Sequence, residues 1–331
     1  MRSNNFVSFH REIDLQLCDS EVAILMCTFQ GQQFLHKQLD SFEAQSLKEW
    51  TLFVSDDMSS DSTLEILQDY QKNWIKGKLN LQIGPSKGFA ANFLSLTCRA
   101  EIRANFYAYA DQDDIWQADK LERAVSWLKT IPTHVPALYC SRTILINEEN
   151  REMGISPLFK RQPSFENALV QNIGGGNTMV FNVAARELIL KAGNDIEVVS
   201  HDWFIYQLVS GSDGIILYDE NPSTLYRQHK SNVVGMNTSW EGRKKRIQMI
   251  WKGRYRKWND TNIQQLEKNM DLLTEKNKKT LLLFKQAKSH SDYKTIKSKL
   301  TALIDLMRSN IYRQKKIETF ALYIAILFNR I

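Results

Sequence analysis

The sequence contains few cysteines, and no two of them are close enough to form a CxxC pair. The four are Cys18, Cys27, Cys98 and Cys140. Zinc sites and redox-active dithiols need closely spaced cysteines, and small secreted domains need many. We therefore expect no zinc site and a reducing, cytoplasmic compartment. Cys27 lies within an apolar run and is expected to be a buried thiol.

Long apolar segments are also absent. No run of eighteen apolar residues occurs, so no membrane-spanning helix is expected. The N-terminal residues lack the apolar core of a secretory signal, so none is expected. The 331 residues are nevertheless 43% hydrophobic, which suits one large globular domain with an appendage.

The glycine-rich fingerprints of common nucleotide-binding sites are missing as well. Neither GxGxxG nor GxxxxGK[ST] is present, which disfavours an ordinary Rossmann dinucleotide site and a P-loop. No nucleic-acid recognition module is visible, and we expect no nucleic-acid partner.

Charge is divided unevenly along the chain. Residues 236–331 contain 22 Lys and Arg against 8 Asp and Glu, a net charge of +14. Residues 1–235 contain the other 21 basic and 29 acidic residues, a net charge of −8. An acidic body and a basic tail suggest two regions with different partners.

Periodicity divides the acidic body into alternating strands and helices. Short apolar runs predict strands, and helical spacing of apolar residues follows each of them. The strands are expected at 21–29, 50–57, 78–84 and 105–111, and the helices at 32–45, 58–74, 87–100 and 118–130. This order predicts an α/β fold with a mostly parallel sheet flanked by helices.

The pattern is looser after about residue 135. We expect one or two strands at 136–147, a glycine turn with a strand and a helix at 174–193, a helix at 200–211, and two extended pieces at 214–235. Residues 1–20 form an N-terminal extension, residues 21–235 the α/β domain, and residues 236–331 a basic helical region.

Acidic residues stand where two of the expected strands end. Asp111 and Asp113 follow the fourth strand, and parallel sheets bind ligands beyond the carboxyl ends of their strands. Carboxylates this close favour Mg²⁺ or Mn²⁺, which would bridge them to phosphate oxygens. The alternative is that Asp113 or Asp114 caps the next helix, and we expect Asp114 to do so.

The end of the second strand carries Asp56 and Asp57. Carboxylates here can accept hydrogen bonds from a ribose or a base, although an Asx turn is the structural alternative. Thr28, Gln30 and Gly31 close the first strand. Gly31 would let the backbone approach a ligand.

Two further candidates lie beyond the parallel region. Asp202 opens a helix after Ser200 and is either a general base or an ordinary helix starter. Arg227 and His229 lie on an extended segment, where they would grip a diphosphate or face solvent.

The basic tail mixes aromatic and cationic residues, most densely in GRKKRIQMIWKGRYRKW at 242–258, and ends in the apolar stretch 317–331. We expect it to dock on an anionic membrane surface. The alternative is a set of helices packed on the domain with a solvated basic face.

Several segments, in the same order, resemble the GT-A domain of family 2 glycosyltransferases. They are VAILMCTFQGQQFLHKQLDSFEAQS, WTLFVSDDMSSDSTLEIL and FYAYADQDDIWQADKLERA. ADQDDIW, SHDWF and YRQHKSNVVG are similar to the bacterial rhamnosyltransferase-like branch. Two positions depart from the family: Met58 replaces a turn glycine, and Gly174–Asn177 reads GGGN where relatives often carry a Gly-Cys pair.

The resemblance implies a role for each matching residue. The nucleotide-sugar donor would be bound by Thr28, Asp56, Asp57, Asp111 and Arg227. The metal, Mn²⁺ or Mg²⁺, would be bound by Asp113 and His229, and the acceptor proton would be taken by Asp202. From its position at the end of the first strand, we expect Gln30 to bind the donor as well.

The implied reaction is inverting, metal-dependent transfer of a sugar onto a hydroxyl of a cell-surface glycan or lipid-linked oligosaccharide. The donor would be dTDP-rhamnose, or otherwise a UDP-hexose, and the enzyme would lie on the inner face of the cell membrane. A non-catalytic nucleotide-sugar-binding adaptor is one alternative. A nucleotidyltransferase is disfavoured, because the loop after the first strand lacks a basic residue before Lys37.

Overall fold

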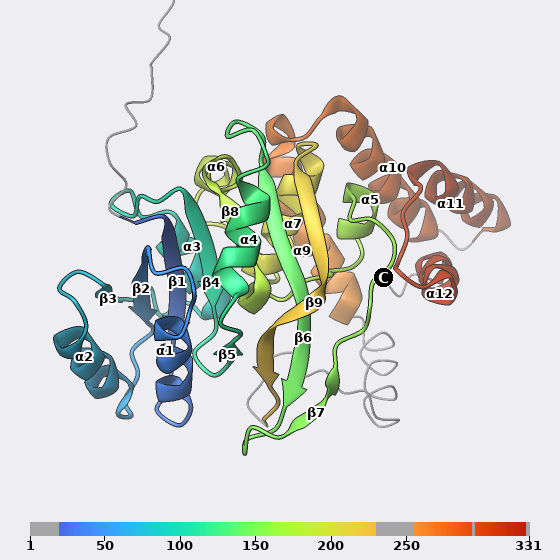
Figure 1. The fold of residues 1–331 in the computed structure, drawn as a ribbon. Helices are drawn as coiled ribbons and strands as arrows, with labels where there is room; N and C mark the ends of the chain where they lie inside the picture. The colour runs from blue at the N-terminus through green and yellow to red at the C-terminus, as the bar shows by residue number, and fades with distance from the viewer. Residues whose placement is uncertain (1–19, 230–253, 293–294, 329–331) are drawn as a thin grey trace, which may run out of the picture.

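A nine-stranded sheet covered by helices on both faces forms the centre of the molecule (Figure 1). The computed structural model describes residues 20–229, 254–292 and 295–328. Along its main path the sheet has the order β3-β2-β1-β4-β8-β6-β9-β5, and β7 pairs with β6.

The first half of the sheet consists of four parallel strands: β1 (Val22–Thr28), β2 (Trp50–Asp56), β3 (Leu79–Ile83) and β4 (Phe106–Ala110). Thr28 pairs with Asp56, and Met26 pairs with Ala110. The carboxyl ends of these strands therefore lie at one edge, where the sequence predicted that the acidic residues would gather.

Each face of β1 belongs to a different apolar core, because successive side chains of a strand point to opposite faces. Val22, Ile24 and Met26 pack in one core, while Ala23 and Leu25 pack in the other. The first core is completed by α1 (Leu35–Glu43), α2 (Thr63–Asn73) and α4 (Lys120–Leu128). The second is completed by α3 (Phe89–Thr97), α6 (Val183–Ala192) and α7 (His201–Gly211). Burial on both faces explains why β1 reads as a continuous apolar run.

The second half of the sheet mixes strand directions. It contains β5 (Ile115–Trp116), β6 (Ala137–Ile146), β7 (Glu152–Ile155), β8 (Val180–Asn182) and β9 (Ile215–Arg227). β8 lies antiparallel between β4 and β6, and β6 is parallel to β9. Short helices α5 (Phe165–Ala168) and η1 (Gly176–Thr178) precede β8. The predicted α/β class is confirmed, with the antiparallel pairs confined to this half.

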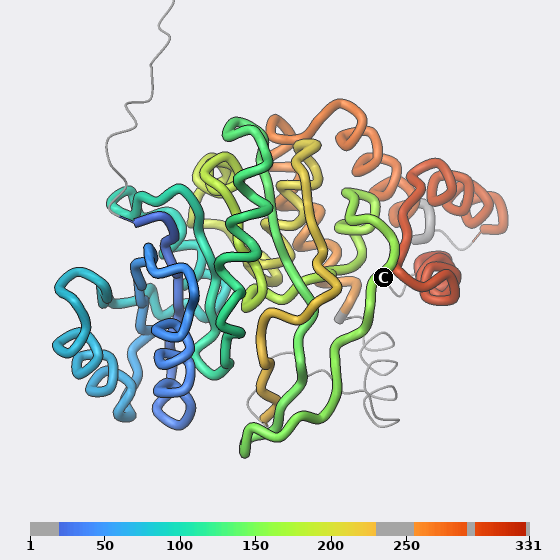
Figure 2. Tube along the Cα trace, in the orientation of Figure 1, coloured from blue at the N-terminus to red at the C-terminus, as the bar shows by residue number. Residues whose placement is uncertain are grey.

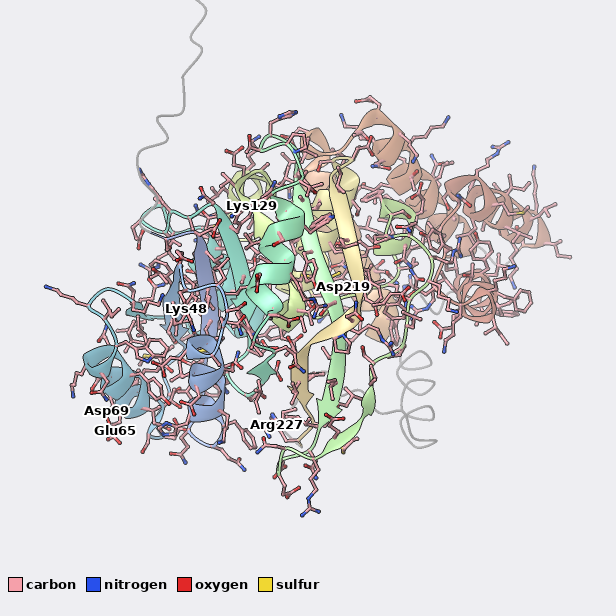
Figure 3. All side chains as sticks on the ribbon, viewed as in Figure 1. Lys48, Glu65, Asp69, Lys129, Asp219 and Arg227 are labelled. Atoms are coloured by element: carbon pink, nitrogen blue, oxygen red, sulfur yellow. The ribbon has the colours of Figure 1, made fainter. Side chains whose placement is uncertain are left out.

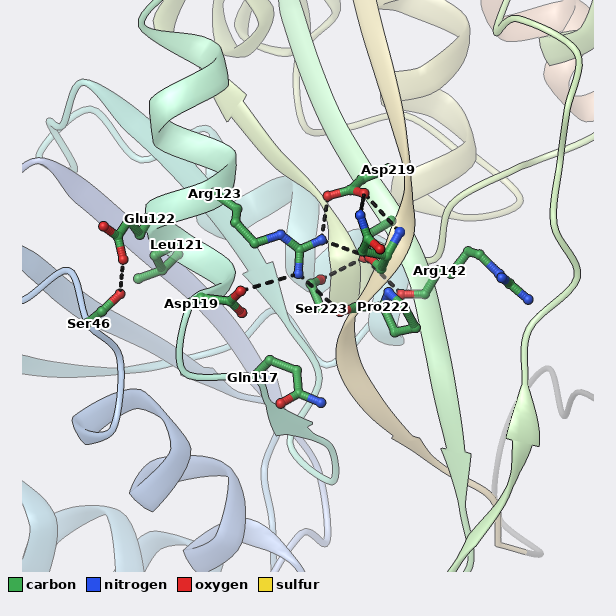
Figure 4. A network of polar contacts seen from close by, with 12 residues as sticks. Ser46, Gln117, Asp119, Leu121, Glu122, Arg123, Arg142, Asp219, Pro222 and Ser223 are labelled. Carbon is green, nitrogen blue, oxygen red and sulfur yellow. Dashed lines mark hydrogen bonds and ion pairs between the residues drawn. The ribbon is translucent and has the colours of Figure 1, made fainter.

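β9 is one long strand with an irregularity, whereas the sequence suggested two extended pieces. Its pairing with β6 changes register between Ser141 and Thr143. Arg123 on α4 donates to Asp219 and to the carbonyl of Asn221, the latter at 2.8 Å (Figure 4). The Tyr139 hydroxyl also donates to Asp219, at 2.6 Å. This polar cluster holds the irregular part of β9 against α4 and so sets the path of the strand toward Arg227.

The C-terminal part of the described chain is helical, as the sequence predicted. It comprises α9 (Arg254–Lys268), η2 (Met270–Leu272), α10 (Glu275–Asp292), α11 (Ile296–Ser309) and α12 (Lys316–Leu327). Leu266, Phe284 and Leu306 belong to the same core as α7. The amide of Asn277 donates to the carbonyls of Ser210 and Gly211 at 3.2 and 3.0 Å. These helices are thus packed on the α/β domain along one side (Figure 2).

Several expectations concern residues outside the described ranges. They include Cys18, the boundary at residue 235 and the basic segment up to residue 253. Within the described residues, Cys27 is a buried free thiol, as expected. None of the described helices combines the length and the apolar character needed to cross a bilayer.

Candidate active site

Asp111 and Asp113 lie immediately beyond β4, at the edge where β1 and β2 also end. The pKa of Asp111 is raised to about 7, first by burial and then by the negative charges of Asp113 and Asp202. Hydrogen bonds connect Asp202, which comes from a distant helix, to the loop after β4. Its carboxylate accepts from the backbone N–H of Gly176, and the amide of the next residue, Asn177, donates to Asp114. The structure therefore gathers three of the predicted acidic residues at one place.

Asp113 is joined to the segment that follows β9. Its Oδ2 lies 2.6 Å from Nε2 of His229, and the two side chains are 19% and 15% exposed. The ring of Phe34 packs against His229 with 5.5 Å between ring centroids. The two residues predicted as metal ligands, 116 positions apart in the chain, are thus adjacent.

Arg227 is placed differently from the expected diphosphate-gripping loop residue. Its side chain lies at the end of β9 (Figure 3) and is completely buried. Nε donates to the backbone carbonyl of Asp113 at 2.8 Å, and Nη1 donates to that of Asn147 at 3.0 Å. The guanidinium also lies 4.4 Å from the centre of the Phe34 ring. We refer to residues 111–114 as the acidic loop. Arg227, which is two residues before His229 in the chain, fixes the backbone of this loop.

Asp114 does not start a helix, so that expectation was wrong. It is fully buried and accepts hydrogen bonds from the amide of Asn177 and, at 3.0 Å, from the backbone N–H of Arg227. The next helix, α4, begins at Lys120. Burial is the main cause of its strongly raised pKa. Asp114 instead links the acidic loop to β9 and to residues 174–177, which we refer to as the glycine-rich turn.

Lys120 is a buried cation that the sequence reasoning missed. Its ammonium donates to the carbonyl of Asn177 and, at 3.3 Å, to the hydroxyl of Thr224, and it lies 3.5 Å from the Trp116 ring centre. Burial lowers its pKa well below the usual value, while Asp114 and Asp111 act in the opposite direction. Its position offered a signal, because it falls on the apolar stripe of α4 with residues 121, 124, 125 and 128.

Gln112, between the two candidate acids, holds the end of β1. Its amide nitrogen donates to the carbonyl of Phe29 at 2.9 Å, and its amide oxygen accepts from the N–H of the same residue at 2.8 Å. A Cβ at Gly31 would collide with this side chain. The close approach that we expected Gly31 to allow is therefore made by Gln112, a residue that the sequence reasoning did not assign.

At the end of β2, the carboxylate of Asp56 finds its hydrogen-bond donors within the protein. Asp56 is buried and accepts from the Thr28 hydroxyl at 2.8 Å, and from the backbone N–H and hydroxyl of Ser59 at 2.8 and 2.6 Å. Gln30, at φ +51°, accepts from the backbone N–H of Asp61 at 3.2 Å and donates to Ser60 at 2.9 Å. The backbone N–H of Gln30 donates to the hydroxyl of Ser59 at 2.9 Å, so Thr28, Gln30 and Asp56 belong to one hydrogen-bonded edge.

Asp57 and Met58 complete this loop. Asp57 accepts a hydrogen bond from the backbone N–H of Ser86 at 2.5 Å and so ties the β2 loop to the turn after β3. Met58 has φ +69°, in the left-handed region that favours glycine. The backbone therefore keeps the conformation of a glycine turn although glycine is absent.

Asp202 lies in the first turn of α7. Its Oδ2 accepts from the backbone N–H of Gly176 at 3.1 Å, and its Oδ1 accepts from that of Trp203 at 2.7 Å. These bonds orient the carboxylate at the helix start, so the structural and catalytic interpretations of this residue are compatible. A Cβ at Gly176 would collide with the ring of His201. The glycine-rich turn is therefore shaped to pass over the first turn of α7.

His201 supports this turn from within the core. Its ring stacks on Phe93 at 3.9 Å between centroids, and burial lowers its pKa to about 4. It is consequently a neutral imidazole at neutral pH, and it adds no positive charge beside Asp202.

The donor atoms of Asp113 and His229 fit a divalent cation. Oδ2 of Asp113 and Nε2 of His229 are hydrogen-bonded to each other at 2.6 Å, and both are atoms that divalent cations take as ligands once that bond is given up. Mg²⁺ is commonly held by one or two carboxylates together with phosphate oxygens. Within residues 20–229, 254–292 and 295–328, no group of three or more His, Cys, Asp and Glu side chains forms a complete metal site. The remaining ligands would have to come from a bound diphosphate and water.

Curated relatives share part or most of the chain. The dTDP-rhamnosyl transferase RfbG of Shigella flexneri is 28% identical over 240 residues, which cover 70% of this chain and 81% of that protein. The UDP-Glc:alpha-D-GlcNAc-diphosphoundecaprenol beta-1,3-glucosyltransferase WfgD of Escherichia coli is 28% identical over 158 residues, 48% of this chain and 58% of WfgD.

Solved structures resemble the fold at low sequence identity. Residues 1–349 of S. aureus TarS superpose with a TM-score of 0.53 at 14% identity, covering 94% of this chain and 88% of that one. GalNAc-T7, solved with UDP, GalNAc and Mn²⁺, gives a TM-score of 0.52 at 11% identity and covers 92% of this chain and 57% of its own. These similarities confirm the glycosyltransferase GT-A fold that the sequence predicted.

The profile of "Glycosyl transferase family 2" matches residues 23–189, which include both acidic strand ends, the glycine-rich turn and most of α6. The chain therefore belongs to glycosyl transferase family 2.

Proposed function

We propose that this glycosyltransferase transfers a sugar from a nucleoside diphosphate to an acceptor hydroxyl with inversion at the anomeric carbon. The observation that carries the proposal is that two hydrogen-bonded contacts meet at the loop after β4. Asp113 contacts His229, and Asp114 is bonded to Asn177, whose neighbour Gly176 donates to Asp202. The bond between the anomeric carbon and the diphosphate oxygen breaks, its electrons pass to the diphosphate, and a bond to the acceptor oxygen forms.

Asp202 is proposed to take the proton of the acceptor hydroxyl. Each carboxylate oxygen accepts one backbone hydrogen bond, from Gly176 and Trp203, and retains a lone pair for a further donor. Because these bonds come from the glycine-rich turn and from the helix start, the carboxylate is oriented before the acceptor arrives.

The nucleotide part of the donor is proposed to lie along the ends of β1 and β2. Thr28, Gln30, Asp56 and Asp57 provide acceptors there, and Asp111 extends this edge toward the acidic loop. Asp56 already accepts three hydrogen bonds, so its chief contribution would be to hold Thr28 and Ser59 in place.

Asp113 and His229 are proposed to hold Mn²⁺ or Mg²⁺ at the diphosphate. Such a cation, when bound, supplies positive charge that stabilises the departing diphosphate. Arg227 is proposed to act as a positioning residue, because its buried guanidinium fixes the backbone of Asp113.

Two relatives guide the choice of donor. RfbG, which matches over most of its own length, is named as a dTDP-rhamnosyl transferase, and WfgD as a UDP-glucose transferase. The more extensive match favours dTDP-rhamnose, and a UDP-hexose is the alternative.

The acceptor is proposed to be a growing cell-surface glycan carried on a lipid. The name of WfgD includes a diphosphoundecaprenol-linked acceptor. The basic C-terminal region agrees with an enzyme that works on the inner face of the cell membrane, at an anionic lipid surface.

The base role is tested with Asp202→Asn, which keeps the shape but removes the proton acceptor. We expect transfer to fall by about a thousandfold or more, while the Kd for the donor changes by less than about threefold. Asp195→Asn is the control, because that carboxylate is 98% exposed. Transfer within tenfold of the wild type would remove Asp202 from this role.

The donor is identified by thermal unfolding with dTDP- and UDP-sugars, each with Mn²⁺ or with EDTA. A bound donor stabilises the protein in proportion to the logarithm of its concentration over Kd, so the preferred nucleotide gives the largest shift. Donor binding without transfer or hydrolysis under any of these conditions would favour the non-catalytic adaptor.

A further inference from the structure

The outward face of α11 consists of large apolar side chains. Ile296, Leu300, Ile304 and Met307 are 88%, 58%, 41% and 67% exposed, and their spacing puts them on one side of the helix. The opposite side, with Ala302 and Leu306, is buried in the core. α11 is therefore apolar on the side that faces away from the domain as well as on the side that packs against it.

α12 repeats this arrangement. Ile317, Phe320, Ile324 and Phe328 are 77%, 69%, 39% and 63% exposed, at helical intervals of three and four residues. Leu322 and Ile326 point into the core instead. A second apolar stripe thus lies on the adjoining helix.

The two helices pack together at the outer end of the molecule, far from the first strands of the sheet (Figure 1). The hydroxyl of Tyr323 on α12 donates to the carbonyl of Leu306 on α11 at 3.2 Å. The ammonium of Lys299 on α11 lies 4.8 Å from the ring centre of Phe328. We refer to the eight exposed residues of the two stripes as the apolar face.

The charges around the apolar face are mainly basic. Residues 295–328 contain six Lys and Arg and two Asp and Glu, a net charge of +4. Of the two acids, Asp305 is buried and Glu318 is ion-paired with Arg313 at 3.2 Å. Lys297, Lys315 and Lys316 are exposed.

We infer that the apolar face of α11 and α12 docks onto the surface of an anionic lipid bilayer. Exposed Ile and Phe side chains flanked by lysines are the pattern of helices that lie in the interface, with the apolar side among the acyl chains and the cations at the head groups. Helices of 14 and 12 residues are too short to span. The face therefore lies on the membrane and does not cross it.

Charge decides between a bilayer and a second copy of the chain. Two apolar faces brought together would oppose two surfaces of net charge +4, whereas an anionic bilayer complements them. The inference extends the proposed function, because it names the surface that would bring the enzyme to a lipid-linked acceptor.

The experiment measures binding of the full chain to sedimented vesicles of phosphatidylcholine, with or without phosphatidylglycerol. The wild type should bind the anionic vesicles more tightly than the neutral ones, and less tightly as salt is raised. Ile317→Ser/Phe320→Ser/Phe328→Ser should lower binding at least about tenfold. Lys297→Gln/Lys315→Gln/Lys316→Gln should lower it at least about tenfold for anionic vesicles only.

The matched control is Ile75→Ser/Ile83→Ser, which removes apolar side chains that are 83% and 73% exposed elsewhere on the domain. It should bind as the wild type does. Unchanged binding by the apolar triple variant would overturn the inference. So would a wild-type dimer that this variant converts to a monomer, since the face would then be covered by a second copy. Sugar transfer to a soluble acceptor is followed in all variants, so loss of docking and failure of the proposed chemistry are seen separately.

Discussion

The two acidic strand ends, after β2 and after β4, look alike in sequence but are built differently. Asp56 is enclosed by hydrogen bonds from Thr28 and Ser59, all of them within the first two strand ends. Asp111 and Asp113 instead lie near a third carboxylate, and burial with this repulsion raises the pKa of Asp111. One strand end is therefore complete within the protein, while the other concentrates negative charge that a bound cation would relieve.

The difference has a structural basis in the residues around each end. The loop after β2 supplies hydroxyls and N–H groups within three residues of Asp56. The loop after β4 depends on distant partners, namely Asn177, Arg227 and His229. We infer that the β2 end shapes the site and the β4 end performs its chemistry.

Of the changes that compare the two strand ends, Asp113→Asn is expected to have the largest effect. Transfer should fall by about a thousandfold because a proposed ligand of the cation is lost, while the free energy of unfolding stays equal or rises as repulsion with Asp111 is relieved. Steady-state kinetics at saturating donor and thermal unfolding are measured together. Activity within tenfold of the wild type would show that the residues at the end of β4 are no more important for the chemistry than those at the end of β2.

Lys120→Met tests how the β4 end is held in place. Removing the buried amino group leaves the carbonyl of Asn177 and the hydroxyl of Thr224 without its hydrogen bonds, which should cost about 1 to 3 kcal/mol of unfolding free energy. Denaturant unfolding measures this loss. The control Lys129→Met removes a lysine whose side chain is 57% exposed and should change stability by no more than about 1 kcal/mol. Equal effects of the two lysine variants would contradict the structural role of Lys120.

Asp56→Asn should affect stability more than chemistry. The amide group cannot accept all three hydrogen bonds, so we expect a loss of about 1 to 3 kcal/mol in unfolding free energy. The kcat should change by less than about tenfold, because Asp56 is not placed at the reacting atoms. A fall in kcat as large as that of Asp113→Asn, with stability unchanged, would reverse the assignment of the two ends.

The smallest expected effect is a gain. Met58 is 64% exposed and adopts φ +69°, so Met58→Gly relieves backbone strain with little loss of packing. Because glycine also raises the entropy of the unfolded chain, the net stabilisation should be at most about 1 kcal/mol, measured by denaturant unfolding. A destabilised variant would mean that contacts of the Met58 side chain stabilise the folded protein by more than the backbone strain costs.

Much of the fold could be predicted because it depends on local patterns. The apolar runs of β1 and β4 come from burial between two helical layers, and the periodicity of α4 comes from packing one of its faces in a single core. Both patterns can be read from the residues of the segment itself. The antiparallel placement of β8 was not predictable in this way, since a strand of three residues carries no directional signal.

The candidate site was predictable in its members and less so in their roles. Strand-end position pointed to Asp111 and Asp113, and the family resemblance pointed to Asp202 and His229. Arg227 was expected to meet the diphosphate, but its guanidinium is buried against the carbonyl of Asp113. The exposure of a side chain on an extended segment depends on what packs over it, and no local pattern records that.

The sequence by itself determined the alternation of strands and helices, the acidic edge of the sheet and the basic C-terminal region, because propensity, periodicity and charge are properties of short segments. Only the tertiary structure decided that Asp114 is buried while Asp113 contacts His229. It also decided which apolar side chains of α11 and α12 are exposed in the part of the chain that the structure describes. The physical reason is that burial, hydrogen bonding and the pKa of a carboxyl group depend on neighbours brought together from distant parts of the chain.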